Sequence, residues 1–271
     1  MTSPVLSLAA LTVLELSPPD MVEVAAQVGY SHVGLRLIPA TPEEHHFPLL
    51  ADLSLRRKTL ARLRDTGVRV LDIEILRLKS DTKVDTLDNL LEAGAELGAS
   101  ELLVAGNDSD FSRLTDNFAA LCERAKPYGL HPHIEFMPWT DVPDLKTALR
   151  VVERAGQANG RVLVDAFHFN RSKSQLEDLQ CLPADFWRYA QLCDVAGPCP
   201  DSMDEILRQA RNERRFPGDG DCDLKALLST LPKSLPLSLE VPTRQLLEQG
   251  VTALERAQLA RDKALKILGE L

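Results

Sequence analysis

The sequence predicts an α/β fold, a single (β/α)8 TIM barrel in which residues 1–271 form one domain. Short apolar runs alternate with amphipathic, helix-like segments eight times along the chain. Regular alternation of this kind produces a parallel sheet. The length of 271 residues suits one such barrel, which typically takes about 250 residues. No linker or low-complexity tract interrupts the chain. Eight repeats therefore favour closure of the sheet into a barrel.

In the first half of the chain, apolar runs predict strands at residues 5–10, 32–38, 68–76 and 101–105. The first helix starts at the Ser17-Pro18-Pro19 signal and runs to Gln27, before Gly29. A second helix ends at Gly67. The next two helices show apolar residues at helical spacing. These residues are Val84, Leu87, Leu91 and Ala95 in one helix, and Leu114, Phe118, Leu121 and Ala125 in the other.

The second half predicts strands at residues 131–135, 161–165, 188–193 and 236–241. Helices are expected at 143–155, from 224 onward and at 250–268, and a short or irregular one around 175–179. A long loop at 198–223 carries a helical piece near 203–212. The active sites of such barrels lie at the C-terminal ends of the strands.

The last four predicted strands each carry one oxygen-bearing side chain near the C-terminal end. These residues are Glu135, Asp165, Gln191 and Glu240. Within each strand the polar residue shares a face with the residue two positions earlier, as Asp165 does with Leu163. Three carboxylates so close together cannot all stay ionised without a cation. The pattern therefore predicts a divalent metal site.

An all-oxygen ligand set favours Mn²⁺ or Mg²⁺, with Co²⁺ as a further candidate, over zinc or copper. Such an ion holds a ketone and an adjacent hydroxyl of a substrate and polarises the carbonyl. Glu135 and Glu240 are then the natural pair to remove and return a proton on opposite faces of the substrate. The alternative is that each polar residue caps a strand end or pairs with an arginine.

Further polar residues are expected at the same mouth of the barrel. Glu74 lies in the third strand and Asn107 follows the fourth, so both are predicted to contact substrate. His168 follows Asp165 by three residues and is a third candidate for proton transfer. Arg214 can bind a carboxylate or phosphate through two parallel hydrogen bonds. Arg171 is a candidate for a second anion contact, and a solvated arginine is the alternative.

Four motifs together make the chain similar to a known superfamily. They are Glu135 in HIEF, the D-x-x-H of Asp165 and His168, the R-x-x-P-G-x-G of residues 214–220, and Glu240 in LEVP. The chain resembles the sugar phosphate isomerase/epimerase superfamily, the xylose isomerase-like TIM barrels. This group includes ketose 3-epimerases, inosose dehydratases and 3-dehydroshikimate dehydratases. The resemblance implies that Glu135, Asp165 and Glu240 bind metal, and that His168 and Arg214 contact substrate oxygens.

One position departs from the epimerases of this group, which usually carry His where this chain has Gln191. The 3-dehydroshikimate dehydratases resemble this chain at that position, with a Gln in the matching segment. The first hypothesis is a metal-dependent isomerase or epimerase of a keto sugar or related polyol, and the second is a dehydratase of a cyclic keto acid or an inosose. An endonuclease-like barrel and a metal-free scaffold barrel stay as further alternatives. Product analysis separates the first two, because dehydration yields an ultraviolet-absorbing conjugated product.

The composition of the chain limits the kinds of partner that it is expected to bind. The formal net charge is −9, which argues against nucleic acid, since duplex binding needs a basic face. No stretch reaches the roughly 20 apolar residues of a membrane span. The N-terminal residues lack the positive segment of a signal peptide, and five cysteines form no C-x-x-C pair. We therefore expect a cytoplasmic protein with reduced thiols and a small-molecule substrate, and leave open whether it forms a homo-oligomer.

Overall fold

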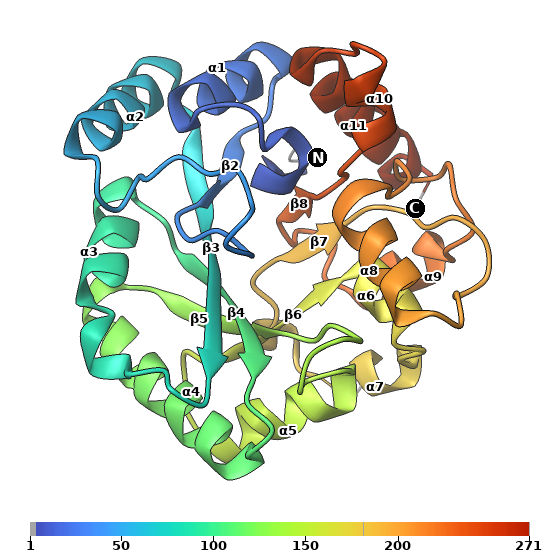
Figure 1. Ribbon diagram of the computed structural model, residues 1–271. Coiled ribbons are helices and arrows are strands. Elements are labelled where there is room, and N and C mark those ends of the chain that lie inside the picture. Colours follow the sequence, from blue (N-terminus) through green and yellow to red (C-terminus); the bar gives the residue numbers. More distant parts are fainter. Residues whose placement is uncertain (1–3, 181, 271) are drawn as a thin grey trace.

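The computed structural model describes residues 4–180 and 182–270, and within them eight parallel strands close into a barrel in sequence order (Figure 1). The strands are β1 Leu6–Leu8, β2 His32–Arg36, β3 Arg69–Lys79, β4 Glu101–Asn107, β5 His131–Glu135, β6 Arg161–Asp165, β7 Ala190–Leu192 and β8 Leu237–Leu239. The barrel closes where β1 pairs with β8, with Leu8 opposite Leu239. The predicted (β/α)8 barrel is thereby confirmed.

Helices surround the barrel and cover its outer face (Figure 1). The helices are α1 Pro18–Val28, α2 Leu53–Thr66, α3 Asp88–Leu97, α4 Phe111–Ala125, α5 Leu145–Ala155, α6 Ala166–Arg171, α7 Leu176–Gln180, α8 Met203–Asn212, α9 Leu224–Thr230, α10 Arg244–Glu248 and α11 Ala253–Leu268. Their apolar stripes face the sheet: in α4, Leu114, Phe118 and Leu121 are fully buried. No helix within the described residues is long and apolar enough to cross a membrane.

Two helices were not predicted as separate elements. The first is α6, which begins directly after β6 because Asp165 both ends the strand and caps the helix, its carboxylate accepting the backbone N–H of His168 at 3.0 Å. The second is α10, which Gly250 separates from α11 by a positive φ of 84°. In addition, β3 extends to Lys79, three residues beyond the prediction.

The barrel encloses a small apolar core of its own, apart from the larger core between sheet and helices. Its buried members include Leu71, Leu103, Leu163 and Tyr189. Leu163 lies two residues before Asp165 in β6, so the side chains at the strand ends continue the same inward-facing column. This core therefore forms the floor beneath the polar residues at the C-terminal mouth.

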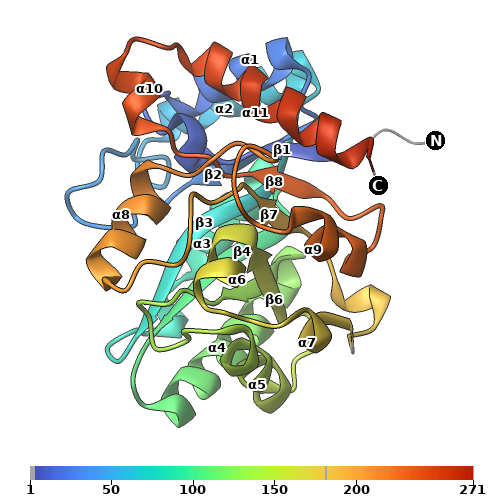
Figure 2. The ribbon, with the colours of Figure 1, turned by 90° about the vertical axis from the view of Figure 1, so that its right-hand side faces the viewer.

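The long connection from β7 to β8 carries α8 beyond the ends of the strands. Figure 2 shows α8 projecting from the barrel on the same side as the loop that follows β2. Among the described residues, the cysteines of this chain are free thiols: Cys122, Cys193, Cys199 and Cys222. Cys181, counted with them in the sequence, lies outside the described residues.

Candidate active site at the mouth of the barrel

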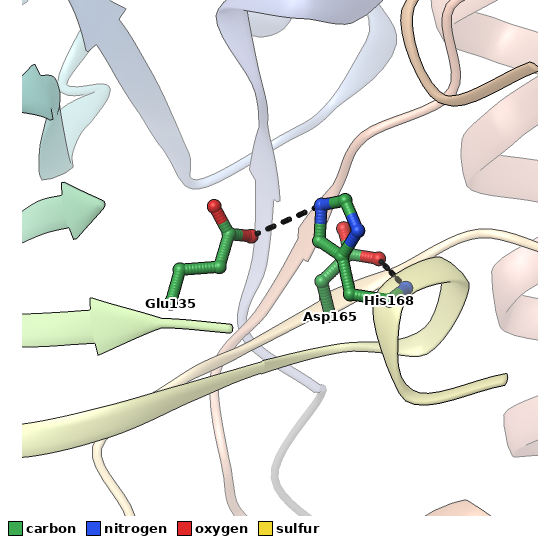
Figure 3. Close-up of side chains that lie close together, drawn as sticks. All are labelled: Glu135, Asp165 and His168. Carbon is green, nitrogen blue, oxygen red and sulfur yellow. Dashed lines mark hydrogen bonds and ion pairs between the residues drawn. The ribbon is translucent and has the colours of Figure 1, made fainter. Parts of the chain in front are cut away.

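Three residues from two neighbouring strand ends form a compact cluster. Glu135 is the last residue of β5, Asp165 is the last residue of β6, and His168 lies in the first turn of α6. Potential ligand atoms of the three lie within 4.8 Å of one another, and all three side chains are buried. His168 Nε2 lies 3.7 Å from Glu135 Oε1 (Figure 3). This spacing suits a shared cation or a shared proton.

Arg214 joins this cluster to the last strand. Its Nη1 lies 2.6 Å from Asp165 Oδ2, and its Nη2 lies 2.8 Å from Glu240 Oε2. The guanidinium is held in place by Nε, which donates to the carbonyl of Ala210 at 2.9 Å. Gln191 completes the chain of contacts, because its Nε2 donates to Glu240 Oε1 at 3.3 Å. One arginine thus compensates part of the charge of two carboxylates.

Two of the four predicted metal ligands have a buried oxygen without a hydrogen-bond partner among the described residues: Glu135 Oε1 and Gln191 Oε1. A buried polar atom left unpaired is unfavourable, so such atoms usually have a ligand. Carboxylate and amide oxygens are the donors that Mn²⁺ and Mg²⁺ prefer. The donor set therefore fits a divalent cation.

Burial and mutual repulsion change the ionisation of the carboxyl groups. Burial, and then the charges of Asp165 and Glu240, raise the pKa of Glu135 well above its usual value. Burial also raises the pKa of Glu240 to about 7, although Arg214 opposes the rise. Burial alone would raise the pKa of Asp165 too, but Arg214 and His168 hold it below its usual value. Without a cation, the site therefore favours a proton on Glu135.

His168 is uncharged at neutral pH in this environment. Burial lowers the pKa of its imidazole to about 4, although the charge of Asp165 opposes the change. The ring packs edge-on against Trp139, with centroids 5.1 Å apart. Its Nδ1 has no hydrogen-bond partner within the described residues. A neutral imidazole with a free nitrogen can coordinate a metal or transfer a proton.

These side chains open into a cavity of about 770 Å³. Five residues predicted as site residues line it: Glu74, Glu135, His168, Arg214 and Glu240. Asp165 and Gln191 do not line the cavity themselves, but each is hydrogen-bonded to a residue that does. Asp165 accepts a hydrogen bond from Arg214, and Gln191 donates one to Glu240. Glu74 faces Arg36, with Glu74 Oε1 3.5 Å from Arg36 Nε. The structure thus brings seven predicted site residues to one end of the barrel.

Two other predicted substrate contacts lie elsewhere. Asn107 lines a neighbouring cavity of about 510 Å³, and its Oδ1 accepts a hydrogen bond from Arg77 Nη1 at 3.0 Å. Arg171 lines neither cavity. Its Nη2 donates to the carbonyl of Ala196 at 2.8 Å and to Gln209 Oε1 at 2.9 Å, so it holds the loop before α8. The structure gives Arg171 a supporting position, not one in the cavity.

The set of metal ligands predicted from the sequence overlaps only in part with the compact cluster that the structure shows. The predicted set is Glu135, Asp165, Gln191 and Glu240, whereas the cluster contains Glu135, Asp165 and His168. Glu240 is turned toward Arg214 and Gln191 by the hydrogen bonds described above. Glu135 and Asp165 belong to both sets.

Several arginines of the cavity escaped the sequence analysis. Arg36 is the last residue of β2, and Arg77 lies close to the end of β3. Both line the cavity. The sequence signal for both is the one that predicts Glu135 and Asp165, a charged residue where an apolar strand ends.

The sequence profile of the xylose isomerase-like TIM barrel family matches residues 22–265. A 3-dehydroshikimate dehydratase of Pseudomonas aeruginosa is 31% identical over 203 residues, which cover 71% of this chain and 30% of that protein. A 3-dehydroshikimate dehydratase of Pseudomonas putida is 25% identical over 259 residues, which cover 87% of this chain and 39% of that protein. The chain thus spans less than two-fifths of the length of either relative.

Solved structures share the fold at lower identity. The crystal structure of the IOLI protein, which carries a zinc atom, superposes with a TM-score of 0.79 at 22% identity and covers 98% of both chains. A D-allulose 3-epimerase from Methylomonas sp. superposes with a TM-score of 0.70 at 14% identity, covering 98% of this chain and 99% of its own. The relatives therefore include both epimerases and dehydratases. Because the family profile covers most of its length, this chain belongs to the xylose isomerase-like TIM barrel family.

Proposed function

We propose that this chain is a divalent-metal-dependent lyase that removes water from a cyclic β-hydroxy ketone of the 3-dehydroshikimate type. The observation that carries the proposal is Gln191 in β7, a glutamine in the segment where the resemblance implies a histidine for the ketose epimerases. Its Nε2 donates to Glu240, and its buried Oε1 has no hydrogen-bond partner within the described residues. The names of the two curated relatives support the same reaction.

Glu135, Asp165, Gln191 and Glu240 are the residues proposed to hold the metal, and His168 is the candidate for a fifth donor. Mn²⁺ fits these oxygen donors best, with Mg²⁺ and Co²⁺ as substitutes. When bound, such a cation polarises a substrate carbonyl and makes the adjacent carbon more acidic. The raised pKa of Glu135 supports this assignment: burial raises it first and the charges of Asp165 and Glu240 raise it further, and a cation would relieve that repulsion.

The protein's own residues would carry the proton through the elimination. Glu240 takes the proton from the carbon next to the ketone, and the electrons of that C–H bond form a carbon–carbon double bond. The hydroxyl on the following carbon then leaves with a proton as water. His168 lines the same cavity and is neutral, so its N–H can supply that proton. One water is lost, and the resulting cyclic dienone becomes aromatic when a proton leaves the ring CH2 group and the ketone oxygen gains one, so that 3-dehydroshikimate would give 3,4-dihydroxybenzoate.

Product analysis tests this proposal against epimerisation. Manganese-loaded protein is incubated with 3-dehydroshikimate in deuterium oxide, and the mixture is followed by ultraviolet absorbance and proton NMR. The proposal predicts stoichiometric formation of 3,4-dihydroxybenzoate. An isomerase or epimerase would instead return non-aromatic material that carries deuterium next to the ketone. That result, with a keto sugar converted under the same conditions, would replace the lyase with an isomerase.

A further inference from the structure

Six arginines line the large cavity, and their pairing is uneven. Four of them have carboxylate partners: Arg36, Arg214, Arg244 and Arg256. The other two, Arg77 and Arg211, have no ion pair with a carboxylate anywhere in the described part of the chain. Arginines that face a cavity without a counter-charge are typical of sites for anionic ligands.

The two unpaired arginines lie at the junction of the two cavities. Arg77 and Arg211 line both the cavity of about 770 Å³ and the neighbouring one of about 510 Å³. Arg77 is fixed by two neutral acceptors, the carbonyl of Ala40 at 3.1 Å and Asn107 Oδ1 at 3.0 Å. Arg211 is exposed on α8, the helix that stands beyond the strand ends (Figure 2).

The local electrostatics favour a bound anion. Burial, followed by the charge of Arg211, lowers the pKa of Arg77, so the two guanidinium groups repel each other. The smaller cavity is lined by three cationic residues, Arg77, Lys79 and Arg211, against one acid, Asp81. An anion between the two arginines would relieve this repulsion.

A third donor lies beside the arginines. Trp139 also lines both cavities, and its indole N–H is buried without a hydrogen-bond partner within the described residues. Its ring packs against that of His168, with centroids 5.1 Å apart. Trp139 therefore connects the two arginine-lined cavities to His168 of the proposed reaction centre.

We propose that Arg77, Arg211 and Trp139 form a subsite for the carboxylate of a cyclic keto acid whose ketone and hydroxyl lie at Glu135, His168 and Glu240. This inference rests on the proposed function, and it names the feature of the substrate that the site selects. A neutral ketose would leave both guanidinium groups without a counter-charge. The subsite therefore discriminates cyclic keto acids from neutral sugars.

Binding of a product-like pair tests the subsite without turnover. Isothermal titration of manganese-loaded protein compares 3,4-dihydroxybenzoate with catechol, which lacks only the carboxylate. Wild-type protein should bind the acid ~10–100-fold more tightly, the scale of a pair of charge-assisted hydrogen bonds. Arg77→Gln and Arg211→Gln should each remove most of that preference. Arg211 is exposed, so its replacement leaves the fold intact even if the Arg77 variant is unstable. Arg244→Gln, at a mouth arginine paired with Glu248, should keep the preference.

Equal affinity for the two ligands in wild-type protein would overturn the subsite, and so would an unchanged preference in Arg211→Gln. Inorganic phosphate and acetate are then compared as competitors of 3,4-dihydroxybenzoate. If phosphate displaces it at a lower concentration than acetate does, and also binds more tightly than 3,4-dihydroxybenzoate, the subsite takes phosphate and the carboxylate assignment fails. If the preference is present and depends on Arg211 but 3-dehydroshikimate is not dehydrated, the subsite stands and the proposed reaction is wrong. The two proposals thus fail through different results.

Discussion

Arg214 determines the charge balance of the site, because it contacts Asp165 and Glu240 at the same time. The sequence predicts a substrate contact for this residue, and the structure instead gives its two Nη atoms carboxylate partners inside the protein. Substrate contact stays a prediction. Arg214 is 4% exposed, so removing its guanidinium would leave two buried carboxylates with less compensation.

Arg214→Ala should therefore destabilise the metal-free protein by about 3–5 kcal/mol, the usual loss when one partner of a buried ion pair is removed. Bound Mn²⁺ should restore part of this loss, since a cation compensates the same carboxylates and binds only the folded state. Thermal unfolding in chelator and in excess Mn²⁺ measures both effects. Arg244→Ala removes one partner of an exposed ion pair and is the control, and it should change the free energy of unfolding little. An equal loss in both conditions would contradict the shared role.

Glu240 is predicted to remove the substrate proton. Glu240→Gln keeps the shape and one ligand oxygen but cannot accept a proton, so kcat should fall ~10²–10⁴-fold while the fold and much of the metal affinity remain. Asp165→Asn should mainly weaken metal binding, and excess Mn²⁺ should recover part of its rate. Exchange of solvent deuterium into the substrate shows whether Glu240 removes the substrate proton. Exchange at the wild-type rate in manganese-loaded Glu240→Gln would pass the role to Glu135 or His168.

At the scale of elements, Asp194 organises the loop that follows β7. Its buried carboxylate accepts the backbone N–H groups of Gly218, Gly220 and Cys222, each at 3.0 Å. The Pro217–Gly220 turn thus directs backbone N–H groups at an anion, and that anion is the Asp194 side chain. The R-x-x-P-G-x-G motif thus places Arg214 by fixing the chain that follows it.

Asp194→Asn should loosen this loop, because an amide offers one acceptor oxygen where the carboxylate offers two. We expect a loss of about 1–3 kcal/mol in the free energy of unfolding, together with faster tryptic cleavage after Arg215. Limited proteolysis and denaturant titration measure the two effects. Asp219→Asn, in the same turn but exposed toward Lys263, is the matched control. Identical cleavage rates in the two variants would remove Asp194 from this role.

The strand ends show why part of the site could be predicted. Glu135 and Asp165 follow apolar runs, so their positions could be read from the sequence, and both lie in the cluster. The start of α6 could not be predicted from the sequence, because Asp165 is both the last residue of β6 and the N-cap of α6. The pairing of Arg214 with Asp165 joins residues 49 positions apart, which only the closed barrel brings together. The unpaired Arg77 and Arg211 likewise become neighbours only through the position of α8.

At the scale of the whole barrel, a buried ion cluster joins β4, β5 and the start of β7. Glu101 accepts hydrogen bonds from His133 at 2.8 Å and from Arg188 at 2.9 Å. Burial raises the pKa of Glu101, but these partners outweigh it and lower the pKa from 4.5 to about 2. The resulting stabilisation, about 3 kcal/mol, is full above pH 4.5 and is lost as the pH falls toward 2.

Glu101→Gln should remove this pH dependence. The difference in unfolding free energy between wild type and variant should be largest near pH 6 and should shrink steadily between pH 4.5 and pH 2. Denaturant titrations at several pH values measure the difference. A difference that stays constant over this range would show that the ionisation of Glu101 does not stabilise the barrel.

We propose that a divalent cation at Glu135, Asp165, Gln191 and Glu240 makes this barrel a dehydratase. The most direct test strips the purified protein with chelator, removes the chelator, and follows the ultraviolet absorbance of the product from 3-dehydroshikimate as Mn²⁺ is added back. We expect no product before Mn²⁺ is added and a rate that saturates at one Mn²⁺ per chain, with a parallel rise in melting temperature. Undiminished product formation in the stripped protein, with no metal detected by elemental analysis, would contradict it.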